Sequence, residues 1–349
     1  MIGVAMIGAG RMARVHAKAI RNTRARIASV YDVLPENSAS LAEELGAKFC
    51  RTAEEAMSAP GVDAVIIASS AASHVEHIKL AVSLGKRVMC EKPLAQSYVG
   101  ALEIHAHLGA EAKRVFMAFN RRFDPGHRRM WERIRAGEIG NVTQLVMHSR
   151  DPGLPPRDYI EKSGGQFRDM MVHNFDMARW LLGEEPVSVY ATGSCVHEAW
   201  VAEAGDVDHS ASILMTASGK IAVLAESRVC SFGFDQRIEA HGSKGMLLSE
   251  NPTQTPLKFY GLGGTDAHYA SSDRLKLFFL ERYGESYAQE IEAFVDVVVD
   301  DADAPVNVHD GLRSAYISEA ATRSFHTGQP VALNERSVFE DPIPKQKSA

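Results

Sequence analysis

The chain has few cysteines, no basic tract and no long apolar run, and each absence excludes a class of protein. Its 349 residues include four widely spaced cysteines with no C-x-x-C pair, which argues against a disulfide scaffold or a zinc site. No apolar run could cross a bilayer, and the net charge of −6 argues against nucleic acid or an anionic membrane as the main partner. An apolar strand starts directly after Met1, so we expect no signal peptide. These features predict a cytoplasmic protein without a metal site.

The N-terminal segment carries a dinucleotide-binding motif. An apolar strand over Val4–Ile7 runs into Gly8-Ala9-Gly10-Arg11-Met12-Ala13, the G-x-G-x-x-A form, and a helical pattern follows at once. Gly8 allows the tight turn, Gly10 lets a pyrophosphate approach the backbone, and Ala13 lets the helix pack closely on the strand. The helix N-terminus offers free N–H groups and a positive dipole end to the phosphates. We therefore predict a dinucleotide site after the first strand.

Asp32 indicates which dinucleotide binds. It ends a second buried strand, about 20 residues beyond the glycines, where an acid accepts hydrogen bonds from ribose hydroxyls. Its charge would repel a 2′-phosphate, and Val33 and Leu34 supply no arginine to bind one. The alternative, an Asp that merely forms a turn at a strand end, fits this spacing less well. The predicted cofactor is therefore NAD rather than NADP.

Strands and helices alternate over the first third of the chain. Helical segments separate strand-like segments, which we place at 3–8, 26–32, 63–69, 87–91 and 114–119. The run over 62–68 is almost continuously apolar, as expected for a strand that is covered on both faces. This alternation predicts a Rossmann domain of α/β class, with a doubly wound parallel sheet, over residues 1–120.

After about residue 120 the pattern changes to consecutive strands. We place them near 141–149, 187–194, 207–217, 219–230, 234–242 and 245–250. Short turns between consecutive strands imply a mostly antiparallel sheet. One long helix, over about 165–182, interrupts the series. Residues 121–349 are therefore predicted to form a second domain of α+β type, for substrate binding and oligomerisation.

The long helix puts a carboxylate and an imidazole on the same line. Asp169, His173, Asp176 and Trp180 fall opposite an apolar line of Met171, Phe175, Ala178 and Leu182. Asp169 could orient the ring and stabilise its charged form, so that His173 takes a proton near neutral pH. Alternatively the two form a solvated pair that contributes roughly a few tenths of a kcal/mol. Periodicity alone favours the solvated pair.

Three other segments place polar groups where a ligand could bind. Glu91-Lys92-Pro93 follows an apolar strand at the carboxyl edge of the sheet, so Lys92 could polarise a substrate hydroxyl or simply be a surface lysine. The segment from Ser69 to His74 could approach the cofactor and also cap the next helix, two compatible roles. Arg121 and Arg122 could contact a polyol or tie the domains together, and the sequence does not distinguish these.

With these motifs assembled, the chain resembles the Gfo/Idh/MocA oxidoreductase family and, within it, the inositol 2-dehydrogenase subfamily. The resemblance covers nearly the whole chain and is specific because the motifs occur in the family's order. Beyond the fingerprint and Glu91-Lys92-Pro93, they are Asn120–Pro125, Ser149–Pro152, Ser163–Gly165, Arg168–Met170, Asn174–Arg179, Gly205–Asp208, Gly242–Gly245 and Phe279–Tyr283.

The resemblance implies a catalytic set and a mechanism. His173, assisted by Asp169, would take the hydroxyl proton while a hydride passes to the nicotinamide, and Lys92 would stabilise the developing alkoxide. Arg121, Asp151 and His173 would contact the substrate. The expected cofactor contacts are Gly8, Gly10, Arg11, Met12, Asp32, Ser69, His74, Glu91 and Lys92. The expected reaction oxidises a cyclic polyol, myo-inositol to 2-keto-myo-inositol (scyllo-inosose), with another inositol isomer or a pyranose sugar as the alternative.

The resemblance also bears on assembly and specificity. The family's second domain is an open-faced sheet commonly used to pair subunits, which implies a homo-oligomer, either a dimer or a homotetramer. Two positions depart from the subfamily pattern, because His173 is followed by Asn174 instead of Asp and Phe234 replaces a tyrosine. A lost hydroxyl contact at Phe234 would leave the substrate isomer open. A non-catalytic NAD-binding sensor is a further alternative, which the complete catalytic set disfavours.

Overall fold

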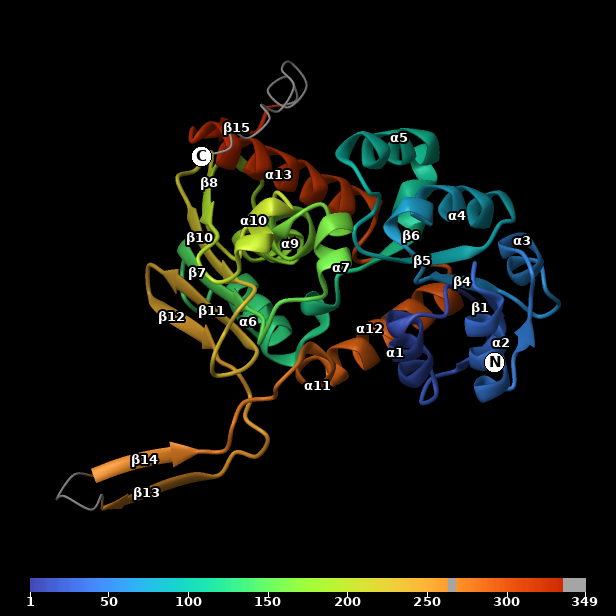
Figure 1. Cartoon of the computed structure of the whole chain (residues 1–349), viewed down its shortest axis with the longest axis horizontal. Helices are drawn as coiled ribbons and strands as arrows, with labels where there is room; N and C mark the ends of the chain where they lie inside the picture. The colour runs from blue at the N-terminus through green and yellow to red at the C-terminus, as the bar shows by residue number, and fades with distance from the viewer. Residues whose placement is uncertain (263–267, 335–349) are drawn as a thin grey trace. The chain divides into compact units, whose positions relative to one another are not determined.

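The chain forms two compact units in the computed structural model, which describes residues 1–262 and 268–334 (Figure 1). Unit 1 consists of Met1–Pro125 and Glu285–Glu319, and unit 2 consists of the described residues of Gly126–Gly284 together with 320–334. Within the described ranges, no helix combines the length and the apolar character that crossing a membrane requires.

Over its described residues, unit 1 is built on one six-stranded parallel sheet with the order β3-β2-β1-β4-β5-β6. The order reverses between β1 and β4, which is where open α/β sheets of this kind bind nucleotides. The predicted doubly wound Rossmann sheet is confirmed. Its strands are β1 (Ile2–Ile7), β2 (Ala25–Tyr31), β3 (Lys48–Phe49), β4 (Ala64–Ile67), β5 (Arg87–Glu91) and β6 (Val115–Ala118).

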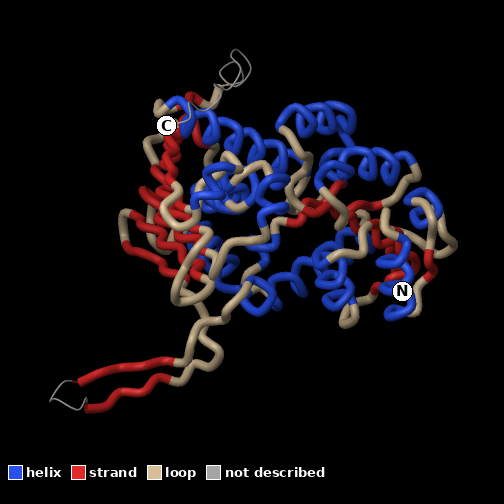
Figure 2. The backbone as a smooth tube through the Cα atoms, in the orientation of Figure 1, coloured by secondary structure: helices blue, strands red, loops and turns tan. Residues whose placement is uncertain are grey.

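Helices cover both faces of this sheet, with α4 and α5 on one face and α1, α2 and α12 on the other (Figures 1 and 2). Strands β4 and β6 are accordingly buried along their whole length, as their apolar sequences require. The helical elements are α1 (Arg11–Ile20), α2 (Pro35–Leu45), α3 (Ala53–Met57), α4 (Ala71–Ser83), α5 (Tyr98–Leu108), the 3-10 turns η1 (Gly109–Arg114) and η2 (Asn120–Phe123), α12 (Gly284–Asp300) and the first part of α13 (Val308–Thr327).

The segment Glu285–Glu319 packs in unit 1, whereas the sequence placed all of residues 121–349 in the second domain. The physical reason is visible at β6, an edge strand of the parallel sheet. The ring of Phe294 on α12 packs edge-to-face on Phe116 of β6, with ring centroids 5.8 Å apart. Helical periodicity predicts that α12 has an apolar face, but it contains no information about which sheet that face covers.

Unit 2 is built on a mixed sheet in which seven described strands follow the order β12-β11-β7-β10-β9-β8-β15. Neighbours β7 and β10 are parallel and every other pair is antiparallel, so the predicted mostly antiparallel sheet is confirmed. The strands are β7 (Val142–Arg150), β8 (Pro186–Ser194), β9 (His209–Thr216), β10 (Ile221–Ser227), β11 (Asp235–Gly242), β12 (Gly245–Ser249) and β15 (Val331–Ala332).

Helices of unit 2 cover one face of this sheet, and α9 contacts β7 and β10 directly (Figure 1). Apolar side chains remain exposed on β8, β9 and β12, which is the open face that the family resemblance implied. Strands β13 (Lys258–Leu262) and β14 (His268–Ser272) pair antiparallel in a separate two-stranded sheet. The helices are α6 (Pro125–Arg135), α7 (Arg157–Ser163), α8 (Gln166–Asp169), α9 (Met171–Leu182), α10 (Ala199–Glu203), α11 (Phe279–Arg282) and the end of α13.

The helix predicted over about 165–182 is broken at Met170, which separates α8 from α9. Its apolar line is buried as predicted, at Met171, Phe175, Ala178 and Leu182. The prediction that Asp176 faces away from the core is wrong, because Asp176 is 1% exposed and lies 3.8 Å from the Arg179 guanidinium. Asp169 thus ends one helix and His173 lies in the first turn of the next.

Candidate active site

The glycine turn after β1 is shaped for a dinucleotide. Gly8 has a φ of 103°, and a Cβ there would lie 2.6 Å from the carbonyl oxygen of Ala68, so only glycine fits. At Gly10, by contrast, a Cβ would meet no described atom within 4 Å. The protein itself therefore does not require glycine at that position, whereas a pyrophosphate approaching the backbone would. Arg11 and Met12 open α1, whose N-terminus has no side-chain cap among the described residues and can receive phosphate oxygens.

Asp32 lies directly beside this turn. One carboxylate oxygen, Oδ2, accepts a hydrogen bond from the backbone N–H of Ala9 at 2.7 Å, and Oδ1 accepts one from Leu34 at 2.9 Å. The acid is thus held at the end of β2, next to the strand that carries the glycines. This arrangement fits a carboxylate that binds the adenosine ribose and disfavours a 2′-phosphate.

His74 joins the two loops that follow β4 and β5. Its Nδ1 lies 2.8 Å from the carbonyl oxygen of Pro93, and its Nε2 lies 3.1 Å from that of Ser69. Burial lowers the pKa of this histidine, against the two carbonyl contacts, which raise it. With 1% of its surface exposed, His74 can act on a cofactor only through the loops that it joins.

Glu91 anchors the lysine that follows it. Its Oε1 lies 2.7 Å from Nε2 of the buried His16 on α1, and its Oε2 accepts the backbone N–H of Lys92 at 3.2 Å. The Lys92–Pro93 peptide bond is cis. Lys92 is half-buried at the carboxyl end of β5, two strands from the glycine turn. Unit 1 therefore brings a fixed lysine to the same sheet edge as the predicted cofactor contacts.

In unit 2, Asp169 is held on both of its oxygens. The Tyr159 hydroxyl donates to Oδ1 at 2.9 Å, and the Arg228 guanidinium lies 3.6 Å from Oδ2. His173 is half-buried in the first turn of α9. Sequence reasoning missed both residues, because Arg228 lies far along the chain and Tyr159 reaches Asp169 only through the conformation of the loop between α7 and α8. The supported carboxylate argues against the freely solvated pair that periodicity favoured.

The two residues that depart from the subfamily pattern, Asn174 and Phe234, both contact side chains of unit 2. Asn174 donates its amide N–H to Oε1 of the buried Glu226 at 2.5 Å. An Asp at this position would place a second carboxylate against Glu226, so the amide matches its neighbour. Phe234 is buried and packs edge-to-face on Tyr283, with ring centroids 5.9 Å apart. Within unit 2, Phe234 is therefore a core contact.

The two other predicted substrate contacts fall in different units. Arg121 is buried in η2 of unit 1, and its neighbour Arg122 donates to Asp310 of the same unit at 2.8 Å. Asp151 is half-buried just after β7 in unit 2, where its backbone N–H donates to the carbonyl oxygen of Ser227 at 2.9 Å. Arg121 therefore lies in the turn that follows β6, and Asp151 lies at the carboxyl ends of the neighbouring strands β7 and β10.

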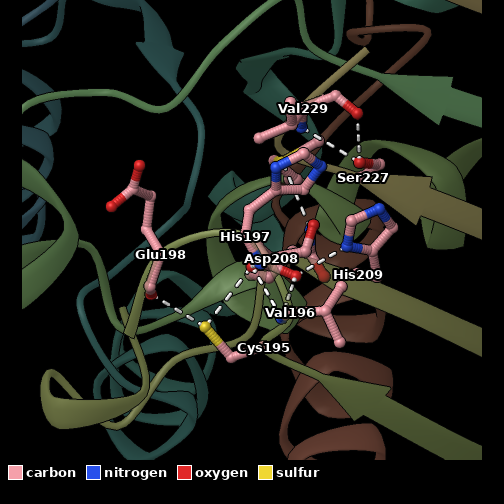
Figure 3. A network of polar contacts seen from close by, with 10 residues as sticks. Cys195, Val196, His197, Glu198, Asp208, His209, Ser227 and Val229 are labelled. Carbon is pink, nitrogen blue, oxygen red and sulfur yellow. Dashed lines mark hydrogen bonds and ion pairs between the residues drawn. The ribbon is translucent and has the colours of Figure 1, made fainter. Parts of the chain in front are cut away.

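A polar network surrounds Asp208, the residue that precedes β9 (Figure 3). Its carboxylate accepts the backbone N–H of His197 at 2.7 Å and lies 2.6 Å from Nδ1 of His209. Burial raises the pKa of Asp208, but hydrogen bonds from His209, His197, Val196 and Cys195 outweigh burial and lower it to about 2. Asp208 is therefore charged at neutral pH. In the described part of the chain, no cluster of three or more His, Cys, Asp or Glu side chains could hold a metal ion.

Comparisons with known proteins agree with this geometry. A family model described as "Oxidoreductase family, NAD-binding Rossmann fold" matches residues 2–119, and "GFO/IDH/MocA C-terminal domain" matches residues 127–248. The chain is 40% identical to inositol 2-dehydrogenase from Rhizobium meliloti over 332 residues, 94% of this chain and 98% of that protein. It is 31% identical to scyllo-inositol 2-dehydrogenase (NAD(+)) from Bacillus subtilis over 345 residues, 96% of this chain and 97% of that protein.

A solved structure extends the likeness to three dimensions. A myo-inositol dehydrogenase from Corynebacterium glutamicum superposes with a TM-score of 0.90 at 36% identity, covering 96% of this chain and 99% of that one. Sequence motifs, sheet topology and relatives over nearly the full length thus agree. The chain belongs to the Gfo/Idh/MocA oxidoreductase family, as an NAD-dependent oxidoreductase similar to the inositol 2-dehydrogenases.

Proposed function

We propose that this protein oxidises myo-inositol to 2-keto-myo-inositol (scyllo-inosose) with NAD. The observation that carries the proposal is the supported Asp169 carboxylate at the end of α8, four residues before His173, in a chain similar over nearly its whole length to an inositol 2-dehydrogenase. A non-catalytic sensor would have no need for Lys92, Asp169 and His173 together.

In the proposed mechanism, His173 takes the proton of the reacting hydroxyl. Asp169 orients the imidazole and stabilises the imidazolium that forms. The Lys92 ammonium stabilises the oxygen as negative charge develops on it. NAD, held by the glycine turn and Asp32, supplies the hydride acceptor when bound. Arg121 and Asp151 contact the other substrate hydroxyls.

The assignment of the base is tested with His173→Ala. We expect kcat to fall by roughly 10²–10⁴-fold, because a positioned general base contributes about that much. Binding of NADH, followed by fluorescence, should not change, because its predicted contacts all lie in unit 1. His107→Ala on the exposed part of α5 is the matched control and should behave as wild type. Turnover that survives in His173→Ala would show that another group is the base.

The substrate is tested by following NADH production over a panel of inositol isomers and aldoses. We expect myo-inositol to give the highest kcat/KM. The relative named for scyllo-inositol favours a second candidate, another inositol isomer. A pyranose sugar is the remaining alternative. If no inositol isomer is oxidised, the inositol assignment is wrong. The same assay would then show whether the protein oxidises a sugar with NAD.

We also propose a cytoplasmic homo-oligomer. All four cysteines lie in the described part of the chain and are free, which fits a reducing compartment. Strands β8, β9 and β12 expose the apolar side chains Tyr190, Ile213, Met215 and Met246, and an apolar patch of this kind is typical of a subunit interface. Light scattering should give the mass of a dimer or tetramer, and the mass of a single chain would contradict this.

A further inference from the structure

We infer that Arg228 is a positioning residue for the oxidation, whose guanidinium, held by Asp206, keeps the Asp169 carboxylate oriented to support His173. The inference rests on the proposed function, because it concerns the residue that assists the proposed base. Arg228 contacts the Asp169 carboxylate, so it acts on the reaction through that carboxylate.

The contacts of Arg228 join two carboxylates. Its guanidinium lies 2.8 Å from Oδ2 of Asp206 and 3.6 Å from Oδ2 of Asp169. The side chain is 1% exposed, and among the described residues its Nε has no hydrogen-bond partner. Burying a guanidinium is costly, and apolar residues of similar volume are often as stabilising as a buried ion pair. Packing alone therefore does not account for an arginine at this position.

The guanidinium is itself fixed from several directions. Asp206 accepts the backbone N–H of Gln166, at the start of α8, through Oδ1 at 2.7 Å. The backbone N–H of Arg228 donates to the carbonyl oxygen of Asp208 at 2.8 Å, and Asp208 is the centre of the network in Figure 3. The Asp206 carboxylate thus connects Arg228 to Gln166, the first residue of α8, and Asp169 is the last residue of the same helix.

Asp169 then has two different supports. Tyr159 donates to Oδ1, and the Arg228 guanidinium attracts Oδ2. The planar fork of an arginine can address Asp206 and Asp169 together, whereas a lysine offers a single ammonium. Rotation of the Asp169 side chain would break the Tyr159 hydrogen bond and remove the carboxylate from the guanidinium. A misplacement of about 1 Å near a reacting group can lower a rate by roughly 10²-fold.

The test is a double-mutant cycle on the full-length protein. The double variant Arg228→Gln/Asp206→Asn neutralises both members of the buried pair, so neither is left charged without the other. It is compared with Asp169→Asn and with the combination of all three changes. We expect the double variant to lower kcat roughly 10–100-fold. NADH affinity should not change. In the Asp169→Asn background the same two changes should lower kcat little further, because their effect on the reaction passes through Asp169.

Two further variants keep the test decisive. Tyr159 is 42% exposed, so Tyr159→Phe should fold and give a smaller loss of kcat that is also absent in the Asp169→Asn background. If the Arg228→Gln/Asp206→Asn variant does not fold, Arg228→Lys takes its place, because it retains the buried charge. It should also lower kcat, and this loss should disappear in the Asp169→Asn background. Arg133→Gln, which removes an ion pair with Glu138 on the surface of the same unit, is the control and should leave kcat unchanged.

The outcomes separate this inference from the proposed function. Losses that add fully in the Asp169→Asn background, or a double variant with wild-type kcat, would overturn the role of Arg228 alone. Wild-type turnover by Asp169→Asn itself would overturn the assisting role of Asp169 and with it that of Arg228, whereas the proposed function is overturned only if the wild-type protein oxidises no inositol. A loss of kcat that disappears in the Asp169→Asn background supports the inference.

Discussion

Asp32 accepts hydrogen bonds from the backbone of Ala9 and of Leu34, so a single carboxylate fixes the turn that approaches the phosphates. We propose that the same group also binds the ribose. Its two roles are coupled, because removing the carboxylate would release the N–H of Ala9 as well as the ribose contact. The effect on cofactor binding should therefore exceed the loss of one exposed hydrogen bond.

We predict that Asp32→Ala weakens NAD binding by roughly 10–100-fold, since hydrogen bonds to a charged group contribute about 1.5–3 kcal/mol. Discrimination against NADP should relax, because the charge that repels a 2′-phosphate is gone. KM values for both cofactors check this. Asp63→Ala is the control, because Asp63 accepts the N–H of Gly3 at the opposite end of β1. An unchanged NAD-to-NADP preference in Asp32→Ala would contradict the ribose role.

At the scale of an element, α12 combines an apolar face with one buried acid, Glu290. This side chain is 0% exposed, and neither of its oxygens has a hydrogen-bond partner among the described residues. Burial, with a smaller contribution from the charge of Glu91, raises the pKa of Glu290 well above its ordinary value. Its folded pKa exceeds its unfolded pKa, so its contribution to stability is complete below the unfolded value and is lost as pH rises through the folded value.

We therefore predict that Glu290→Gln stabilises the protein at high pH. The amide cannot ionise, so the decline in the free energy of unfolding above about pH 5 should become shallower. At pH 8 the gain should be on the order of 1 kcal/mol. Denaturant unfolding from pH 5 to 9 measures this, with Glu292→Gln on the exposed face of α12 as the control. Curves for Glu290→Gln and wild type that stay parallel would contradict the prediction.

At the scale of the whole molecule, unit 1 is made of two segments that are distant in the chain. Besides the Phe294–Phe116 contact, the backbone N–H of Met117 donates to the carbonyl oxygen of Val306 at 2.9 Å, and that of Ala304 donates to Lys113 at 2.8 Å. These bonds satisfy backbone groups of β6 and its approach that would otherwise be left without a protein partner. A fragment that stops at Pro125 would expose this edge.

We predict that a fragment of residues 1–125 is unstable, whereas the same fragment joined by a flexible linker to residues 285–319 folds and binds NADH. Circular dichroism melts and NADH fluorescence measure this. In the joined fragment, Phe294→Ala should lower the free energy of unfolding by about 3–5 kcal/mol, because it leaves a cavity against Phe116. Equal melting temperatures for the two fragments would show that the second segment is not part of the folding unit.

The sequence by itself determined the features that depend on neighbours in the chain. The glycine turn, Asp32 and the alternation of strands and helices are local patterns, so the parallel sheet and the preference for NAD could be predicted from them. The buried line of α9 follows in the same way from helical periodicity. Residue types at motif positions, with the family resemblance, also identified Lys92, Asp169 and His173 as candidates.

Only the tertiary structure decided what surrounds those candidates. The break at Met170, the partner of Asn174, the packing of α12 on β6 and the support of Asp169 by Tyr159 and Arg228 all depend on residues that are distant in the chain or on loop conformation. Such contacts leave no periodic signal in the sequence, because a side chain can meet any partner that the fold brings within reach. The sequence therefore names the groups that could react, and folding determines what holds them in place.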